Sequence, residues 1–317
     1  MNIFNFSKLK LPIIQAPMAG GFNTPELAST VANLGGVGSF GFSFTSPEKI
    51  DEILKTTKKL TNGLLNANFF VFKPVELPEL TVQNEAIKAI STLSFKEKFE
   101  INVPNKPFYI DLDTQIEATL KNFPSIITFH LGIPSLNIIE KIKSMGIKVG
   151  ITATNLNEAK SIQNIGADFI VAQGYEAGGH RGVFNQENID EKMKLDNLLI
   201  KILENVSVPI VAAGGIMDGR DIKRVTKIGA KAAQLGTAFL TCDEAGTSAI
   251  HKYYLLNEQK RKTQITKAFS GRVARGINNK FIEEMSGKQI FPFPIQNTVT
   301  TPLRRMSQNK NNGEFIN

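Results

Sequence analysis

The sequence has little of the residues that build disulfides and thiolate metal centres. Cys242 is the one cysteine among 317 residues, and only three histidines are present. An internal disulfide and a zinc site made of thiolates are therefore excluded. The neighbours of Cys242 offer no activating base, so we interpret it as an inert thiol. Histidines and carboxylates also lack metal-ligand spacing, and we predict no metal.

Long apolar runs are missing as well. None approaches the ~18 residues that a membrane-spanning helix needs. The lysines within residues 1–10 precede no apolar core of the kind found in signal peptides. With 42% hydrophobic residues the composition is that of a globular protein. The sequence therefore predicts a cytoplasmic protein that has no membrane partner.

Acidic residues are fewer than basic ones, and the net charge is +8. Such an excess fits either a nucleic-acid surface or solvated helix faces with a basic tail. No nucleic-acid motif accompanies the charge, so the second interpretation is favoured and no nucleic-acid partner is predicted. A mild positive field also attracts small anions.

Short apolar runs alternate with amphipathic segments along much of the chain. This alternation indicates a parallel sheet, and eight units favour an α/β fold of the (β/α)8 TIM-barrel type. An open doubly wound sheet fits less well, because residues 15–21 lack the Gly-x-Gly-x-x-Gly fingerprint after the first strand. The eight runs are residues 11–17, 37–40, 64–71, 125–130, 148–152, 168–172, 208–212 and 232–235.

The alternation is interrupted twice. A proline-containing stretch from residue 73 to 114 is too long for an ordinary strand-to-helix loop. After residue 241 the alternation stops, with a helix expected over 245–262. We predict a barrel from residues 1–73 and 114–241 and a smaller capping domain from 74–113 and 242–300. The polar tail of residues 301–317 is expected to be frayed or loosely docked.

The densest chemistry lies in residues 173–182, directly after the sixth apolar run. In a barrel, catalytic groups occupy the C-terminal ends of the strands. His180 can hold or transfer a proton near neutral pH, or it can be a structural histidine. His130 carries the same two interpretations. We expect Glu176 to orient this loop, for instance through Arg181, and His251 to lie on the surface of a helix outside the barrel.

Two glycine-containing turns follow the seventh and eighth runs. Gly214-Gly215 and Gly236-Thr237 offer main-chain N–H groups at the positions where barrel enzymes commonly bind phosphate. Asn68 and Gln173 end the third and sixth runs, and an amide matches the mixed donor and acceptor edge of a flavin. The alternative interpretation is purely structural: the glycines allow close packing, and the two amides form hydrogen bonds within the protein.

Four motifs in this order are similar to those of nitronate monooxygenases, formerly called 2-nitropropane dioxygenases. They are residues 12–21, 176–182, 213–216 and 234–237, and the resemblance covers nearly the whole chain, including 270–272. It implies an FMN-binding (β/α)8 barrel with a smaller capping domain. It also implies conversion of alkyl nitronates, such as propionate 3-nitronate, to a carbonyl compound and nitrite with O2.

The resemblance implies roles for individual residues. His180 matches the active-site histidine, which bonds the nitronate or takes the α-proton of a nitroalkane. His130 is a further candidate for contact with the small anionic substrate. The residues expected to contact FMN are Met18, Asn68, Gln173, Gly178, Gly179, Gly215, Gln234, Leu235, Gly236 and Thr237.

The sequence also departs from the best-defined enzymes of this kind. Phe293, Asn297 and Thr301 stand where those enzymes tend to carry two tyrosines and a lysine facing the substrate. This argues against propionate 3-nitronate as the preferred substrate. An FMN-dependent enoyl-acyl-carrier-protein reductase that uses NAD(P)H is the alternative, because such enzymes share the Glu-Ala-Gly-Gly-His loop of residues 176–180.

Overall fold

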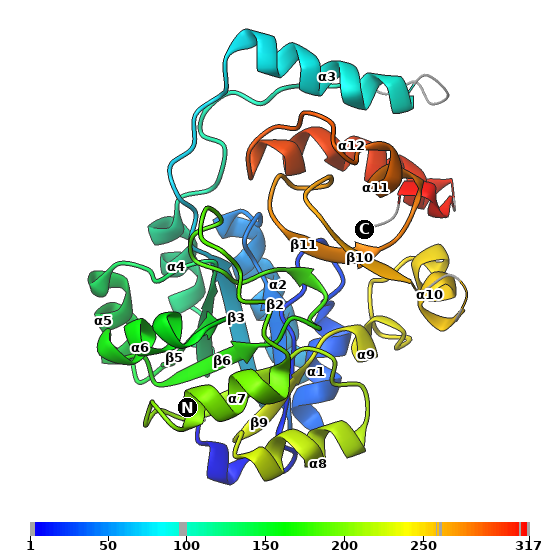
Figure 1. Cartoon of the computed structure of the whole chain (residues 1–317). Coiled ribbons are helices and arrows are strands. Elements are labelled where there is room, and N and C mark those ends of the chain that lie inside the picture. The colour runs from blue at the N-terminus through cyan, green and yellow to red at the C-terminus, as the bar shows by residue number, and fades with distance from the viewer. Residues whose placement is uncertain (1–3, 95–99, 258, 260–261, 311, 316–317) are drawn as a thin grey trace. The chain divides into compact units, whose positions relative to one another are not determined.

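The computed structural model describes residues 4–94, 100–257, 259, 262–310 and 312–315 (Figure 1). The chain forms two compact units. The first, here called the barrel unit, comprises Met1–Phe72, Ile110–Ala177 and Gly182–Gly246. The second unit comprises Lys73–Tyr109, Gly178–Arg181 and Thr247–Asn317.

The barrel unit is built on a closed sheet of parallel strands. Its order is β1-β2-β3-β4-β5-β6-β8-β9, and β9 pairs back onto β1. The (β/α)8 fold expected from the alternation is therefore confirmed. The strands are β1 (Ile13–Gln15), β2 (Val37–Gly41), β3 (Leu64–Phe70), β4 (Ile126–His130), β5 (Lys148–Ala153), β6 (Phe169–Gln173), β8 (Ile210–Ala213) and β9 (Ala232–Leu235).

Most of the helices of the barrel unit begin at a polar residue whose side chain caps them. Thr24 accepts from the N–H of Leu27 and Ser46 from that of Lys49, each with proline at the first helical turn. The helices are α1 (Pro25–Asn33), α2 (Pro47–Leu60), α4 (Leu112–Leu120), α5 (Leu136–Ser144), α6 (Leu156–Asn164), α7 (Leu195–Leu203), α8 (Gly219–Ile228) and α9 (Thr237–Leu240); a 3-10 turn, η1 (Phe6–Lys8), precedes β1.

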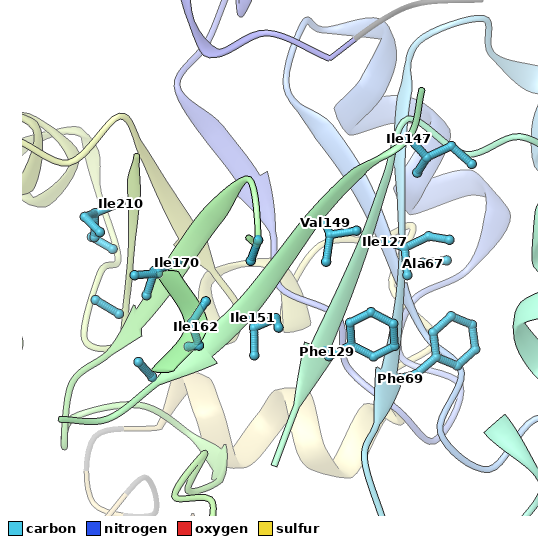
Figure 2. Close-up of a cluster of buried hydrophobic side chains, with 14 of the residues drawn as sticks. Ala67, Phe69, Ile127, Phe129, Ile147, Val149, Ile151, Ile162, Ile170 and Ile210 are labelled. Carbon is cyan, nitrogen blue, oxygen red and sulfur yellow. The ribbon is translucent and has the colours of Figure 1, made fainter. Parts of the chain in front are cut away.

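Alternate residues of the strands face the surrounding helices and form the main core. Figure 2 shows Ala67 and Phe69 from β3 with Ile127 and Phe129 from β4 in this cluster. All four are fully buried. Burying each of the larger side chains, those of Phe69, Ile127 and Phe129, stabilises the fold by roughly 1.5–3 kcal/mol. This layer holds the strands in register and so fixes where their ends lie.

Aromatic rings pack together at the N-terminal ends of the strands. Phe169 begins β6, and its ring lies 5.5 Å from that of Phe6 in η1. The ring of Phe4 lies 4.7 Å from that of Phe6. An apolar cluster therefore covers this end of the barrel. The polar strand-end residues lie at the opposite, C-terminal end, where barrel enzymes carry their sites.

The second unit contains a small antiparallel sheet of order β10-β11-β7. Helices α3 and α12 contribute Ala86, Ile90, Val299 and Leu303 to its core. Its elements are α3 (Leu80–Ser94), β7 (Gly179–His180), α10 (Ala249–Leu256), β10 (Thr263–Thr266), β11 (Ala274–Ile277), α11 (Lys280–Glu284), α12 (Ile295–Asn309) and the 3-10 turn η2 (Gly313–Phe315). Among the described residues no helix is long and apolar enough to cross a membrane.

Two segments differ from the sequence predictions. The tail expected to be loose from residue 301 is helical to Asn309, and Leu303 and Phe315 are buried. The helix expected over 245–262 is shorter, α10, and residues 258, 260 and 261 lie outside the described part. α7 begins at Leu195 and does not extend back to Lys192, because Lys192 has a positive φ of 50° that a helix cannot contain.

Candidate active site

Several of the residues predicted to contact a cofactor end neighbouring strands of the barrel. Gln173 of β6 is in register with Ala213 of β8, and Ala213 with Gln234 of β9. Asn68 on β3 is in register with Thr128 on β4. The register therefore aligns amides and glycine turns along one rim of the barrel unit.

Gly182 lies against residues at or near the C-terminal ends of three strands. A Cβ at this position would lie 2.8 Å from Cγ2 of Thr152 and 2.9 Å from Cε1 of His130. It would also lie 3.3 Å from Oε1 of Gln173, which accepts a 2.8 Å hydrogen bond from the Gly182 N–H. His130 and Gln173, predicted separately, are thus brought together around a glycine that leaves no room for a side chain.

Gly214 and Gly215 turn the chain sharply after β8. Both have positive φ, 113° and 63°, which favours glycine. A Cβ on Gly214 would lie 3.0 Å from the N of Ala177, and one on Gly215 would lie 3.0 Å from Cβ of Glu176. The turn therefore packs closely on the loop that follows β6. In the described part of the chain, the N–H groups of the two glycines donate no hydrogen bond.

The turn after β9 is similar in character. Gly236 precedes the one-turn helix α9, and no side chain caps that helix. A Cβ on Gly236 would lie 3.3 Å from Cβ of Ala16 and 3.7 Å from Sδ of Met18. Met18 is thereby placed beside the predicted phosphate turn, together with Thr237, the first residue of α9.

Asn23 is a residue of this rim that the sequence did not reveal. Its Oδ1 accepts a hydrogen bond from the N–H of Met18, and its Nδ2 donates to the carbonyl of Ala16 at 3.3 Å. The side chain therefore ties the loop after β1 into a fixed shape. The next residue, Thr24, caps α1.

Glu176, which was predicted to orient the loop after β6, bonds to the start of α7. Its carboxylate accepts from the N–H of Leu195, at 3.0 Å to Oε2 and 3.3 Å to Oε1. The N-cap residue Lys194 provides no acceptor for the first turn of α7, and the carboxylate of Glu176 takes that place. Glu176 thus ties its loop to α7.

His180 lies in the second unit, on the short edge strand β7. β7 pairs antiparallel with β11, with His180 opposite Ala274. The Nε2 of His180 lies 2.9 Å from Oγ of Ser270, whose hydroxyl donates to the carbonyl of Arg272 at 3.1 Å. The ring also contacts Phe293 edge to face, with centroids 5.4 Å apart. These contacts hold the imidazole in one orientation.

Asn297 and Thr301, two of the positions that differ from the best-defined enzymes, lie on α12 beside the guanidinium of Arg304. The Nη2 of Arg304 donates to Oδ1 of Asn297 at 2.9 Å and to Oγ1 of Thr301 at 2.8 Å. Burial lowers the pKa of Arg304 to about 10, with the neighbouring charge of Arg305 as a further cause. A guanidinium therefore lies beside Asn297 and Thr301 on α12. Sequence inspection missed Arg304 because it lay in the expected tail.

His251 was predicted to be a surface residue, and this was wrong. It lies on α10 and is 5% exposed. Burial lowers its pKa from 6.5 to about 4, so the ring is neutral near pH 7. It belongs to the packing of the second unit and lies outside the predicted site.

The glycine N–H groups and the amide side chains of this rim suit an anionic cofactor whose ring carries both hydrogen-bond donors and acceptors, better than they suit a metal. The described residues contain no group of three or more His, Cys, Asp or Glu side chains that could hold an ion. Close-packed glycine turns with uncommitted N–H groups match a phosphate. The amides of Asn68 and Gln173 match a ring that presents both donors and acceptors.

Comparison with known proteins identifies the family of the chain. The family described as "Nitronate monooxygenase" matches residues 3–316. A probable nitronate monooxygenase of Staphylococcus saprophyticus is 37% identical over 97% of this chain and 87% of its own length. A nitroalkane oxidase from Streptomyces ansochromogenes has a structure that superposes with a TM-score of 0.92, at 33% identity over 98% of this chain and 89% of that one.

The fold, without close sequence similarity, is also found in other proteins. The enoyl reductase domain of MlnA from Bacillus amyloliquefaciens matches with a TM-score of 0.59 at 14% identity, over 87% of this chain and 65% of that one. The family match covers both units and all four sequence motifs. The chain therefore belongs to the nitronate monooxygenase family of oxidoreductases.

Proposed function

We propose that this protein binds FMN and oxidises alkyl nitronates with O2 to a carbonyl compound and nitrite. The observation that carries the proposal is the family match over residues 3–316, at an identity of 37% to a curated relative. FMN, when bound, supplies the electron acceptor for the oxidation of the nitronate. The protein supplies binding, orientation and the handling of charge.

The barrel unit is assigned to the cofactor. The N–H groups of Gly215, Gly236 and Thr237 bind the phosphate, which needs close approach of the main chain. Asn68 and Gln173 bind the polar edge of the ring system, with Met18, Gln234 and Leu235 beside it. Gly182, whose N–H donates to Gln173, fixes the orientation of that amide.

His180 is assigned to the substrate. An imidazole N–H can donate to a negatively charged nitronate oxygen, and a neutral imidazole can take the α-proton of a nitroalkane. Ser270 and Phe293 hold the ring, which reduces the entropy lost when substrate binds. Phe293 provides no phenol hydroxyl, so we infer that alkyl nitronates without a carboxylate are accepted at least as well as propionate 3-nitronate.

The first experiment uses purified full-length protein. We expect a yellow flavin spectrum, and O2 uptake with ethyl nitronate and with propionate 3-nitronate in the absence of nicotinamide. A colourless protein that FMN cannot reconstitute would contradict the proposal. Rapid anaerobic bleaching of the flavin by NADPH, without nitronate oxidation, would instead indicate an enoyl reductase.

A second experiment tests His180. The His180→Asn variant should bind FMN like the wild type but lose about 100-fold in kcat/KM with nitronates, because a group that donates to or accepts from the reacting atoms is removed. Ser270→Ala should give a smaller loss, since the imidazole remains but is less well held. Unchanged kinetics in His180→Asn would remove this residue from the assignment.

A further inference from the structure

A chain of side-chain hydrogen bonds crosses the interior of the barrel beneath one of the proposed cofactor ligands. Asn68 donates through Nδ2 to Oγ1 of Thr128 at 2.9 Å, and Thr128 donates to Oδ1 of Asn66 at 3.0 Å. Asn66 donates through Nδ2 to Oγ of Ser39 at 3.2 Å. All four residues are at most 4% exposed. They come from three neighbouring strands, β2, β3 and β4.

The placement of these residues follows from the pleat of the strands. Asn66 and Asn68 are two residues apart on β3, so both side chains point into the barrel while Ala67 and Phe69 point outward into the core (Figure 2). Polar side chains at such positions destabilise a core unless each is paired, because an unpaired buried amide costs about 1–3 kcal/mol. The chain of bonds provides this pairing.

The bonds also have a direction. The Oδ1 of Asn66 can only accept, so the hydroxyl of Thr128 must donate its single proton to it. The oxygen of Thr128 is then available only as an acceptor. It therefore requires Nδ2, and not Oδ1, of Asn68 on its side. The Oδ1 of Asn68 is turned away from Thr128 and accepts no hydrogen bond from the described residues.

We propose that Asn66 and Thr128 are positioning residues that set the direction of the Asn68 amide, so that Asn68 presents its oxygen to a ring N–H of the cofactor. This inference rests on the proposed function, because it assumes that Asn68 meets the polar edge of FMN. Asn66 and Thr128 act through Asn68 and touch no reacting atom. Without the Thr128 hydroxyl, the amide of Asn68 can rotate, and a part of the molecules then presents NH2 to the ring.

The test compares two substitutions of Thr128 in the full-length protein. Thr128→Val keeps the shape and removes the hydroxyl, whereas Thr128→Ser keeps the hydroxyl. FMN dissociation constants are measured by flavin fluorescence, and the visible absorption spectrum of the bound flavin is recorded. We expect Thr128→Val to weaken FMN binding about fivefold to tenfold, the typical loss for one hydrogen bond, and to shift the spectrum. Thr128→Ser should stay within about twofold of the wild type, with an unshifted spectrum.

The outcomes separate this inference from the cofactor assignment. If the wild type binds no FMN, both the proposed function and this inference are wrong. If the wild type binds FMN and Thr128→Val matches it in affinity and spectrum, only the inference is wrong. Equal weakening by the valine and serine variants would also overturn it, because packing would then explain the loss. Should the valine variant fail to fold, Thr128→Cys, a weaker donor of similar size, is judged by the same criteria.

Discussion

Three side chains from different strands converge on Gly182, a position with no room for a side chain. Thr152, His130 and Gln173 surround the space that a Cβ would occupy. His130 and Gln173 end β4 and β6, and Thr152 lies one residue before the end of β5, so a side chain at position 182 would push against the rim of the barrel. The glycine therefore sets how closely the loop after β6 approaches the strand ends.

We predict that Gly182→Ala lowers the free energy of unfolding by about 1–3 kcal/mol, the usual cost of overpacking. The same substitution should weaken FMN binding, since Gln173 is displaced. Gly219→Ala is the matched control, because a Cβ at Gly219 meets nothing within 4 Å. Chemical denaturation of both variants measures the difference. Equal stability of the two would contradict the close approach.

Single residues of the site differed in how far the sequence revealed them. Asn68 and Gln173 could be proposed because Asn68 lies near the end of an apolar run and Gln173 directly follows one. Thr128 and Asn23 could not, since their partners lie 60 residues away along the chain or on the main chain of a loop. A hydrogen bond between distant residues leaves no local pattern in a sequence.

Among the elements, α7 depends on a residue outside itself. Its N-cap, Lys194, provides no side-chain acceptor, and Glu176 from the loop after β6 accepts from Leu195 instead. A helix start of this kind joins two parts of the rim, because the carboxylate belongs to the loop and the N–H to the helix. The favourable interaction of a negative charge with a helix N-terminus adds to the hydrogen bond.

Glu176→Ala should therefore destabilise the barrel unit by about 1 kcal/mol, as the loss of a helix cap does. Glu176→Gln keeps the acceptor and should lose less than half of that. Thermal unfolding of both variants in the presence of excess FMN gives the comparison. An alanine variant as stable as the wild type would show that α7 needs no acceptor from this loop.

The helices and strands also differ in how well the sequence predicts them. The barrel strands were predicted from their apolar runs because each is buried on both faces. β7 was not, since its two residues become a strand only by pairing with β11, some 90 residues later in the chain. The start of α7 is equally hard to read from the sequence, because the polar residues before it are compatible with helix, whereas the positive φ of Lys192 is set by the surrounding chain.

At the scale of the whole molecule, the buried His251 couples stability to pH. Its folded pKa of about 4 lies below the ordinary 6.5, so the unfolded chain binds a proton more readily. The stabilising effect of burying a neutral ring is fully present above pH 6.5 and is lost as the pH falls toward 4. A shift of this size corresponds to about 3 kcal/mol.

We expect the second unit to lose about that amount of stability between pH 6.5 and 4, measured by denaturant unfolding at several pH values. His251→Gln cannot titrate in this range, so the difference in stability between it and the wild type should shrink as the pH falls. A constant difference across the range would mean that His251 contributes nothing to the pH dependence.

The division of the chain has a consequence for how such a protein can evolve. The boundaries at Phe72, Tyr109, Ala177, Arg181 and Gly246 mean that the chain passes between the two units five times. Neither unit is a continuous gene segment that recombination could exchange in one event. The four residues Gly178–Arg181, which include His180, are inserted within a barrel loop. A new substrate preference is therefore expected to arise by point substitution in place, and not by the acquisition of a different cap.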